Sequence, residues 1–209
     1  MRKLELNGLG AASGRPDTAE IAIKFFDTDF NCAKALERVK SDIAAFDGKL
    51  NALNLGKDVL KTDALTVDQQ YDYRDNERIF KGYCCHCTAN IDMPLSSEAL
   101  NAVLDAAASF GRGTTFSVSF TVKDKDALAG EALSAAVRDA FDKAQIIASA
   151  AGVKLGAVQE ICPADIIRTE PRRNTEAVAF AMRAAAPQPE YVPDDIKINA
   201  RVRVVWEIE

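Results

Sequence analysis

The sequence has little of what most catalytic sites and membrane segments need. Its 209 residues include one histidine, His86, and one tryptophan, Trp206. No stretch approaches the roughly 18 consecutive apolar residues of a transmembrane helix. No nucleophile, base and orienting group stand in a recognisable catalytic pattern, and no long run of one charge sign occurs. We therefore expect no enzyme activity, no cofactor and no membrane span.

The charge balance argues against a nucleic-acid partner. The formal net charge is −5, from 31 acidic and 26 basic residues that are dispersed along the chain. Nucleic-acid binding needs a concentrated basic surface that displaces counterions. Apolar residues make up 48% of the chain and charged residues 27%, which is typical of a folded globular protein. We expect one domain over residues 1–209.

The first residues do not look like a signal peptide. After Arg2 and Lys3 the chain alternates apolar and polar residues in Leu4-Glu5-Leu6, which is a strand pattern and not a continuous apolar core. We expect a cytoplasmic protein. The alternative is the periplasm or cell envelope, if an export signal has been removed.

Hydrophobic periodicity predicts alternating strands and helices. Strands are expected at 2–8, 19–26, 58–74, 78–93, 116–122, 155–161 and 196–208, and helices after Thr28 or Asp29, after Ser96 or Ser97, and over 126–151. The middle order, β-α-β-β-α-β, is ferredoxin-like. We predict an α+β fold in which this core is extended by a further helix and strands, with the helices packed on a mostly antiparallel sheet. In the helix at 126–151, the predicted buried side is Leu133, Val137, Ala140, Ala144, Ile147 and Ala151.

Residues 162–195 interrupt this regular pattern. They hold five of the seven prolines, so they are not expected to form one regular element. A short apolar helix is predicted within them, over 176–186. Connections of this length in a compact domain are usually functional or mediate interactions.

The cysteines cluster in one predicted strand. The chain has five cysteines, an odd number that makes a poor disulfide framework, so we expect reduced thiols. Cys84, Cys85, His86 and Cys87 stand in a row and suggest a metal site. On a strand, however, Cys84 and His86 face one way while Cys85 and Cys87 face the other, whereas a structural zinc site needs four converging ligands.

A Cys–His nucleophile fails for a similar reason. Cys84 and His86 would project in parallel, with their Cβ atoms roughly 6–7 Å apart, which is too far for a hydrogen bond without bending. We therefore expect these four residues to be small or partly buried strand residues. The alternative is a metal- or small-ligand-binding module that uses this strand.

Two other patterns have structural interpretations. Gly8-x-Gly10-x-x-x-Gly14 has the wrong spacing for a dinucleotide site, and a turn is predicted there. Asp124 and Asp126 lie at a helix boundary, where capping is the expected role. Five aromatic residues on neighbouring predicted strands are expected to pack across the strands, with a binding surface as the alternative. They are Tyr71, Tyr73, Phe80, Tyr83 and Phe116.

The order of several short motifs resembles the SIMPL-domain family, a bacterial domain of unknown function. The motifs are Gly8-x-Gly10 with Arg15-Pro16-Asp17, Ile79-x-x-Gly82-Tyr83, Phe110-Gly111 before Phe116-x-Val118-x-Phe120, Ala140-x-x-Lys143-Ala144, and Ala151-Gly152-x-x-Leu155-Gly156-x-Val158. The resemblance implies an α+β fold, a tendency to oligomerise, and no established catalytic residues. It also implies export to the periplasm or envelope in many members.

These observations lead to one main hypothesis. We expect a non-catalytic interaction or scaffold protein that forms a homo-oligomer, with a different protein partner as a further expectation. The solvated strand faces, the apolar segment at 171–193 and the family resemblance motivate it. Deleting residues 172–190 is predicted to reduce assembly and leave the core folded.

Overall fold

The structure is a computed structural model that describes residues 2–53, 55, 59–74, 77–110, 113–169 and 190–209. The strands are β1 (Arg2–Gly14), β2 (Thr18–Asp29), β3 (Leu60–Thr62), β4 (Thr66–Arg74), β5 (Glu77–Pro94), β6 (Thr114–Thr121), β7 (Leu155–Thr169) and β8 (Ile196–Ile208). The helices are α1 (Cys32–Ala52), α2 (Ser97–Ala108) and α3 (Lys125–Ala151). The predicted α+β class is confirmed.

The chain divides into two compact units that interleave along the sequence. The first contains residues 1–16, 121–171 and 193–209, and the second contains residues 17–120 and 172–192. No shift of composition along the sequence marks a boundary between these units. The expectation of one domain over 1–209 stays a prediction.

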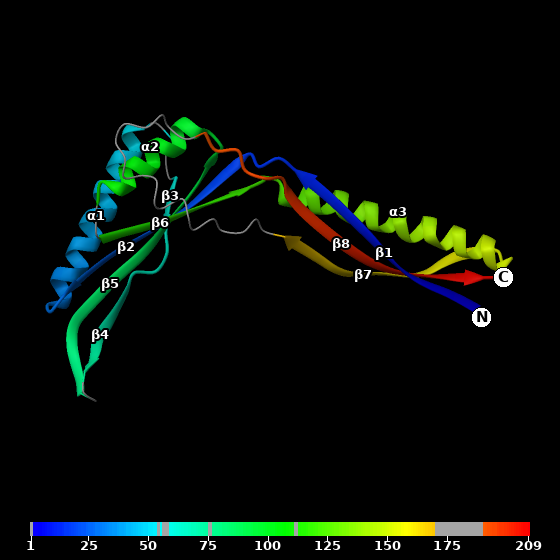
Figure 1. Ribbon diagram of the computed structural model, residues 1–209, viewed down its shortest axis with the longest axis horizontal. Helices are drawn as coiled ribbons and strands as arrows, with labels where there is room; N and C mark the ends of the chain where they lie inside the picture. Colours follow the sequence, from blue (N-terminus) through cyan, green and yellow to red (C-terminus); the bar gives the residue numbers. More distant parts are fainter. Residues whose placement is uncertain (1, 54, 56–58, 75–76, 111–112, 170–189) are drawn as a thin grey trace. The chain divides into compact units, whose positions relative to one another are not determined.

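In the first unit, α3 packs on a sheet of order β1-β8-β7 (Figure 1). Both strand pairs are antiparallel. The expected alternation in β8 is confirmed, because Ile198, Val202 and Trp206 are almost fully buried in the core of this unit. The buried side of α3 is a stripe of alanines, namely Ala132, Ala136, Ala140, Ala144 and Ala148.

The predicted buried side of α3 is therefore partly wrong. Val137 and Ile147 are 37% and 41% exposed, while Ala132 and Ala136 are fully buried. Sequence periodicity favours the largest apolar side chains for the interior. In the structure the smallest ones face the sheet, since α3 lies very close to the backbone of β1.

The turn predicted at Gly8 and Gly10 is also wrong, because both residues lie inside β1. A Cβ atom at Gly8 would come within 2.7 Å of the Ala140 Cβ, and one at Gly10 would collide with the backbone of α3 at Ala132 and Ala136. Because these glycines have no side chain, the alanine stripe of α3 can approach the strand closely.

In the second unit, α1 and α2 pack on a sheet of order β3-β5-β2-β6, with β4 also paired to β5 (Figure 1). Apart from the short β3, which follows α1, the chain order β2-α1-β4-β5-α2-β6 is the predicted ferredoxin-like β-α-β-β-α-β arrangement. The core contains alternate residues of β2, including Ile21, Ile23 and Phe25, with Val39 and Phe46 of α1.

Several predicted boundaries need correction. Asn31 caps α1 in place of Thr28 or Asp29, because its Oδ1 accepts a hydrogen bond from the Ala33 N–H at 2.9 Å. The strand predicted over 58–74 is two strands, β3 and β4. The predicted caps at Ser96 and Gly152 are confirmed, as is capping of α3 by Asp124.

The proline-rich interruption begins later than predicted. Strand β7 continues through Pro163 to Thr169. Its register against β8 shifts between Val158 and Glu160, before the proline, and again between Pro163 and Asp165. Pro163 removes one backbone donor from a strand at the edge of its sheet, where proline is tolerated. The helix predicted over 176–186 lies outside the described residues, as does the segment proposed for deletion except for its last residue, Glu190.

Candidate interaction site

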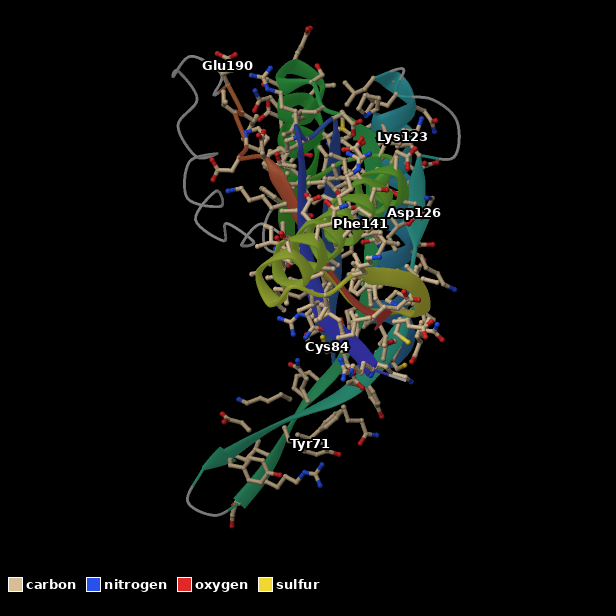
Figure 2. All side chains as sticks on the ribbon, turned by 90° about the vertical axis from the view of Figure 1, so that its right-hand side faces the viewer. Tyr71, Cys84, Lys123, Asp126, Phe141 and Glu190 are labelled. Carbon is tan, nitrogen blue, oxygen red and sulfur yellow. The ribbon has the colours of Figure 1, made fainter. Side chains whose placement is uncertain are left out.

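A two-stranded arm extends from the sheet of the second unit. Strand β2 pairs with β5 only as far as Asp29 opposite Tyr83, whereas β4 pairs with β5 from Thr66 opposite His86 out to Arg74 opposite Glu77. Residues 70–74 and 77–82 therefore continue as a ribbon beyond β2. Figure 2 shows Tyr71 on this arm and Cys84 where the arm meets the sheet.

Gly82 sets the point where the arm leaves the sheet. Its φ is +121°, and the register of β5 against β4 shifts here, since Gln70 pairs with Gly82 and Tyr71 with Phe80. A Cβ at Gly82 would lie 2.8 Å from the Asp29 carbonyl oxygen. The bulge bends the ribbon past the turn that leads into α1, and only glycine fits this close approach without strain.

One face of the arm carries an aromatic cluster. The centroid of the Phe80 ring lies 5.4 Å from that of Tyr71, 5.3 Å from that of Tyr83 and 6.1 Å from that of Phe30, and each pair of rings has edge-to-face geometry. The Arg78 guanidinium lies 3.6 Å above the centre of the Tyr71 ring. The predicted cross-strand packing is confirmed for Tyr71 and Phe80, while Tyr83 packs against Phe80 of its own strand.

The cluster is only partly covered by its unit. Phe30 is 70% exposed, whereas Tyr71, Phe80 and Tyr83 are partly buried. Elsewhere on the arm, Tyr73 is 71% exposed and Ile79 is also exposed. Phe116, which was grouped with these residues in the sequence, packs instead against the core beneath α1 and α2. A ribbon of two strands is marginally stable alone, so its aromatic contacts stabilise an element that would otherwise fray.

The cysteines of β5 divide between the two faces as predicted. Cys85 and Cys87 are 0% and 2% exposed and belong to the core beneath α1 and α2, while Cys84 lies outside that cluster. No group of three or more histidine, cysteine or carboxylate residues among the described parts of the chain is arranged to hold a metal ion. Cys84, Cys85, His86 and Cys87 therefore do not converge on this strand as the ligands of one metal site would.

His86 has a partner on the neighbouring strand. Its Nδ1 lies 3.6 Å from Asp68 Oδ2 of β4, and its side chain is 28% exposed. This contact joins β4 to β5 at the root of the arm. It places the histidine ring beside a carboxylate of the neighbouring strand.

The environment of the buried thiols keeps them protonated. Burial raises the pKa of Cys85, and the neighbouring thiols add to this effect. Burial also raises the pKa of Cys87, with a further contribution from Asp63. Nucleophilic cysteines need the opposite shift, since the thiolate is the reactive form. These two residues behave as core side chains.

Sequence reasoning missed two parts of the arm. Phe30 follows β2 in a turn and carries no strand pattern, so nothing placed it near Phe80. The second is the outer edge of β4. The sequence predicts one long hairpin, but it does not show that β2 ends before the hairpin does and leaves its outer part as an arm. The spacing Ile79-x-x-Gly82-Tyr83 was a usable signal, since a glycine within a strand often marks a bulge.

Comparison with solved structures gives no information on activity. An amidase of the hydantoinase/carbamoylase family from Burkholderia phymatum has a TM-score of 0.25 and 12% identity, covering 55% of this chain and 30% of that chain. A hydrolase from Listeria innocua has a TM-score of 0.22 and 10% identity, covering 93% and 91%. Neither likeness is close enough to carry an argument about fold or chemistry.

Comparison with curated sequences is more informative. Uncharacterized protein YggE from Escherichia coli (strain K12) is 26% identical over 203 residues, which cover 97% of this chain and 82% of that protein. Uncharacterized protein YggE from Edwardsiella ictaluri is 22% identical over 204 residues, covering 97% and 85%. The family model SIMPL, described as "Protein of unknown function (DUF541)", matches residues 4–206. The chain therefore belongs to the SIMPL family.

Proposed function

We propose that this chain is a non-catalytic protein that acts by associating with further copies of itself. The observation that supports this proposal best is the arm formed by β4 and β5. It extends past β2, and it exposes Tyr73, Ile79 and the neighbouring Phe30. Exposed aromatic side chains are typical of protein interfaces.

The chemistry of the described residues is consistent with this proposal. The buried thiols have raised pKa values, and the single histidine of the chain is engaged with Asp68. Family membership assigns no reaction to the chain, because the family is described as one of unknown function.

The molar mass in solution tests the proposal. Sedimentation velocity or light scattering after size exclusion, over a wide range of protein concentrations, is expected to give masses above that of one chain, 22.6 kDa. A single-chain mass at every workable concentration would rule out self-association. Mass above one chain that appears only after mixing with a cell extract would indicate a different protein partner.

A further inference from the structure

We infer that the arm is a pairing edge, at which β4 of one copy joins β4 of a second copy in antiparallel register centred on Tyr71. This inference deepens the proposed function, on which it rests, by naming the surface and its partner. It starts from how the edge strands of the two sheets are protected. An open strand edge presents backbone donors and acceptors to any other strand, so proteins usually block it.

Three edge strands carry such protection. In β1, the Leu9 N–H donates to Asp139 Oδ2 of α3 at 2.7 Å, so a helix side chain occupies that backbone donor. In β7, Pro163 and repeated shifts of register interrupt the edge. Strand β3 is only three residues long. Each of these is a recognised means of preventing edge-to-edge pairing.

Strand β4 lacks these features. It runs for nine residues, contains no proline or lysine, and pairs with β5 alone among the strands of the described chain. The irregularity in its pairing with β5 comes from an extra residue, Lys81, on the β5 side. Strand β6 also ends its sheet; Tyr191 contacts its Phe120 side chain, with ring centroids 6.1 Å apart, and hydrogen-bonds to Asn101 of α2. The edge of β4 is the better candidate for pairing because it lies on the arm that carries the exposed Tyr73.

Charge along β4 makes a second copy a suitable partner in one register. When two identical strands pair in antiparallel fashion about a two-fold axis, one residue lies opposite its own copy. Each possible register can be named by that central residue. Registers centred on Asp68, Gln70 or Asp72 place aspartates opposite aspartates, which is destabilising. The register centred on Gln69 places no opposite charges together. A register centred on Tyr73 places Asp72 opposite Arg74, but it pairs only residues 72–74 of β4, whereas one centred on Tyr71 pairs residues 68–74.

The register centred on Tyr71 differs from these. It places Asp68 opposite Arg74 of the other strand, and by symmetry it does so twice. It also places Gln69 opposite Tyr73, which is 71% exposed in the single chain. Opposite charges that face each other across antiparallel strands stabilise the pair. The two aromatic clusters would then meet at Tyr71 and form one continuous face.

A charge-swap experiment tests this register. Arg74→Asp and Asp68→Arg each place like charges opposite one another, and each is expected to weaken self-association about tenfold or more. The double variant Asp68→Arg/Arg74→Asp restores opposite charges and is expected to return to within about threefold of the natural chain. Glu37→Arg, on the exposed side of α1, makes the same charge change as Asp68→Arg away from the arm and is expected to have no effect.

The outcomes separate the inference from the proposed function. Circular dichroism and the melting temperature of every variant report whether the fold is retained. If the natural chain associates but the double variant stays as weak as the single variants, the Tyr71-centred register is wrong and self-association stands. If no charge variant changes the mass, association uses another surface, such as β6. If the natural chain is a monomer throughout, both proposals fail.

Discussion

Gly8 and Gly10 show how single residues determine the packing of the first unit. Both lie in β1 where the alanine stripe of α3 comes closest, and a Cβ on either would collide with that helix. From sequence alone the pair predicts a turn, because glycine is most often found in turns. Whether such glycines form a turn or a close-packed strand position depends here on Ala136 and Ala140. These alanines are distant in sequence, so they cannot be recognised as packing partners without the structure.

Replacing Gly10 with alanine is therefore expected to destabilise the protein by about 1–3 kcal/mol, the usual cost of overpacking. Gly130→Ala is the matched control, because this exposed glycine of α3 has open space around it. Alanine there is expected to stabilise the helix by about 0.5–1 kcal/mol. Urea unfolding of both variants measures the difference, and equal effects would contradict the close-packing explanation.

Asp139 links α3 to β1 through its charge. Hydrogen bonds from Lys143 and from the Leu9 N–H lower the pKa of Asp139 in the folded state. A carboxyl group with a lowered folded-state pKa stabilises the fold above its ordinary pKa. That contribution disappears as the pH falls through the folded-state value.

The variant Asp139→Asn keeps an acceptor for Leu9 but loses the charge. We expect it to lower the free energy of unfolding at neutral pH by about 1 kcal/mol or less, since the pair with Lys143 is partly exposed. The deficit should vanish in acid, because the natural aspartate is then protonated too. Unfolding curves at several pH values test this, and a deficit that persists below the folded-state pKa would contradict it.

At the scale of elements, the sequence predicted most helices and strands but not the surfaces through which they meet. The period of α3 identified a helix, and the alternation of β8 identified its buried side correctly. The buried side of α3 was misassigned because close approach to β1 selects alanine over valine and isoleucine. The arm was predicted as a hairpin, yet its projection depends on where β2 ends.

The bulge at Gly82 is expected to be essential for the arm. Gly82→Ala would force a side chain into a positive φ and toward the Asp29 carbonyl, at a cost of about 1–3 kcal/mol. Gly48→Ala in α1, where nothing lies within 4 Å of the added Cβ, is the control and should be neutral or stabilising. Thermal unfolding compares the two, and a neutral effect of Gly82→Ala would show that the bulge tolerates a side chain.

The thiols of β5 are expected to be unreactive in the folded protein. Burial raises the pKa of Cys85 and Cys87, so the unfolded chain ionises at these positions before the folded chain does. Stability should therefore fall as the pH rises above the ordinary pKa of a thiol. A thiol reagent near pH 8 should modify the exposed Cys32 quickly and the buried cysteines only after unfolding. Rapid labelling of a Cys32→Ser/Cys162→Ser variant would contradict this assignment.

For the whole molecule, composition and family membership limit only the broad class of protein. The structure adds one specific surface, the arm formed by β4 and β5. The chain belongs to a family of unknown function, and no helix among its described residues is long and apolar enough to cross a membrane. The cytoplasmic location and the absence of a nucleic-acid partner stay predictions. Self-association was expected from the sequence and stays a proposal. The surface proposed for it could not be predicted from the sequence, since the edge of β4 in the described chain results from how β2, β4 and β5 end relative to one another.

The mass of the natural chain in solution, measured beside that of the Arg74→Asp variant, is the decisive test of self-association through β4. We predict a concentration-dependent mass above 22.6 kDa for the natural chain. In the folded variant, the same mass should be reached only at about tenfold higher concentration. A mass of 22.6 kDa for the natural chain at every concentration would contradict the account.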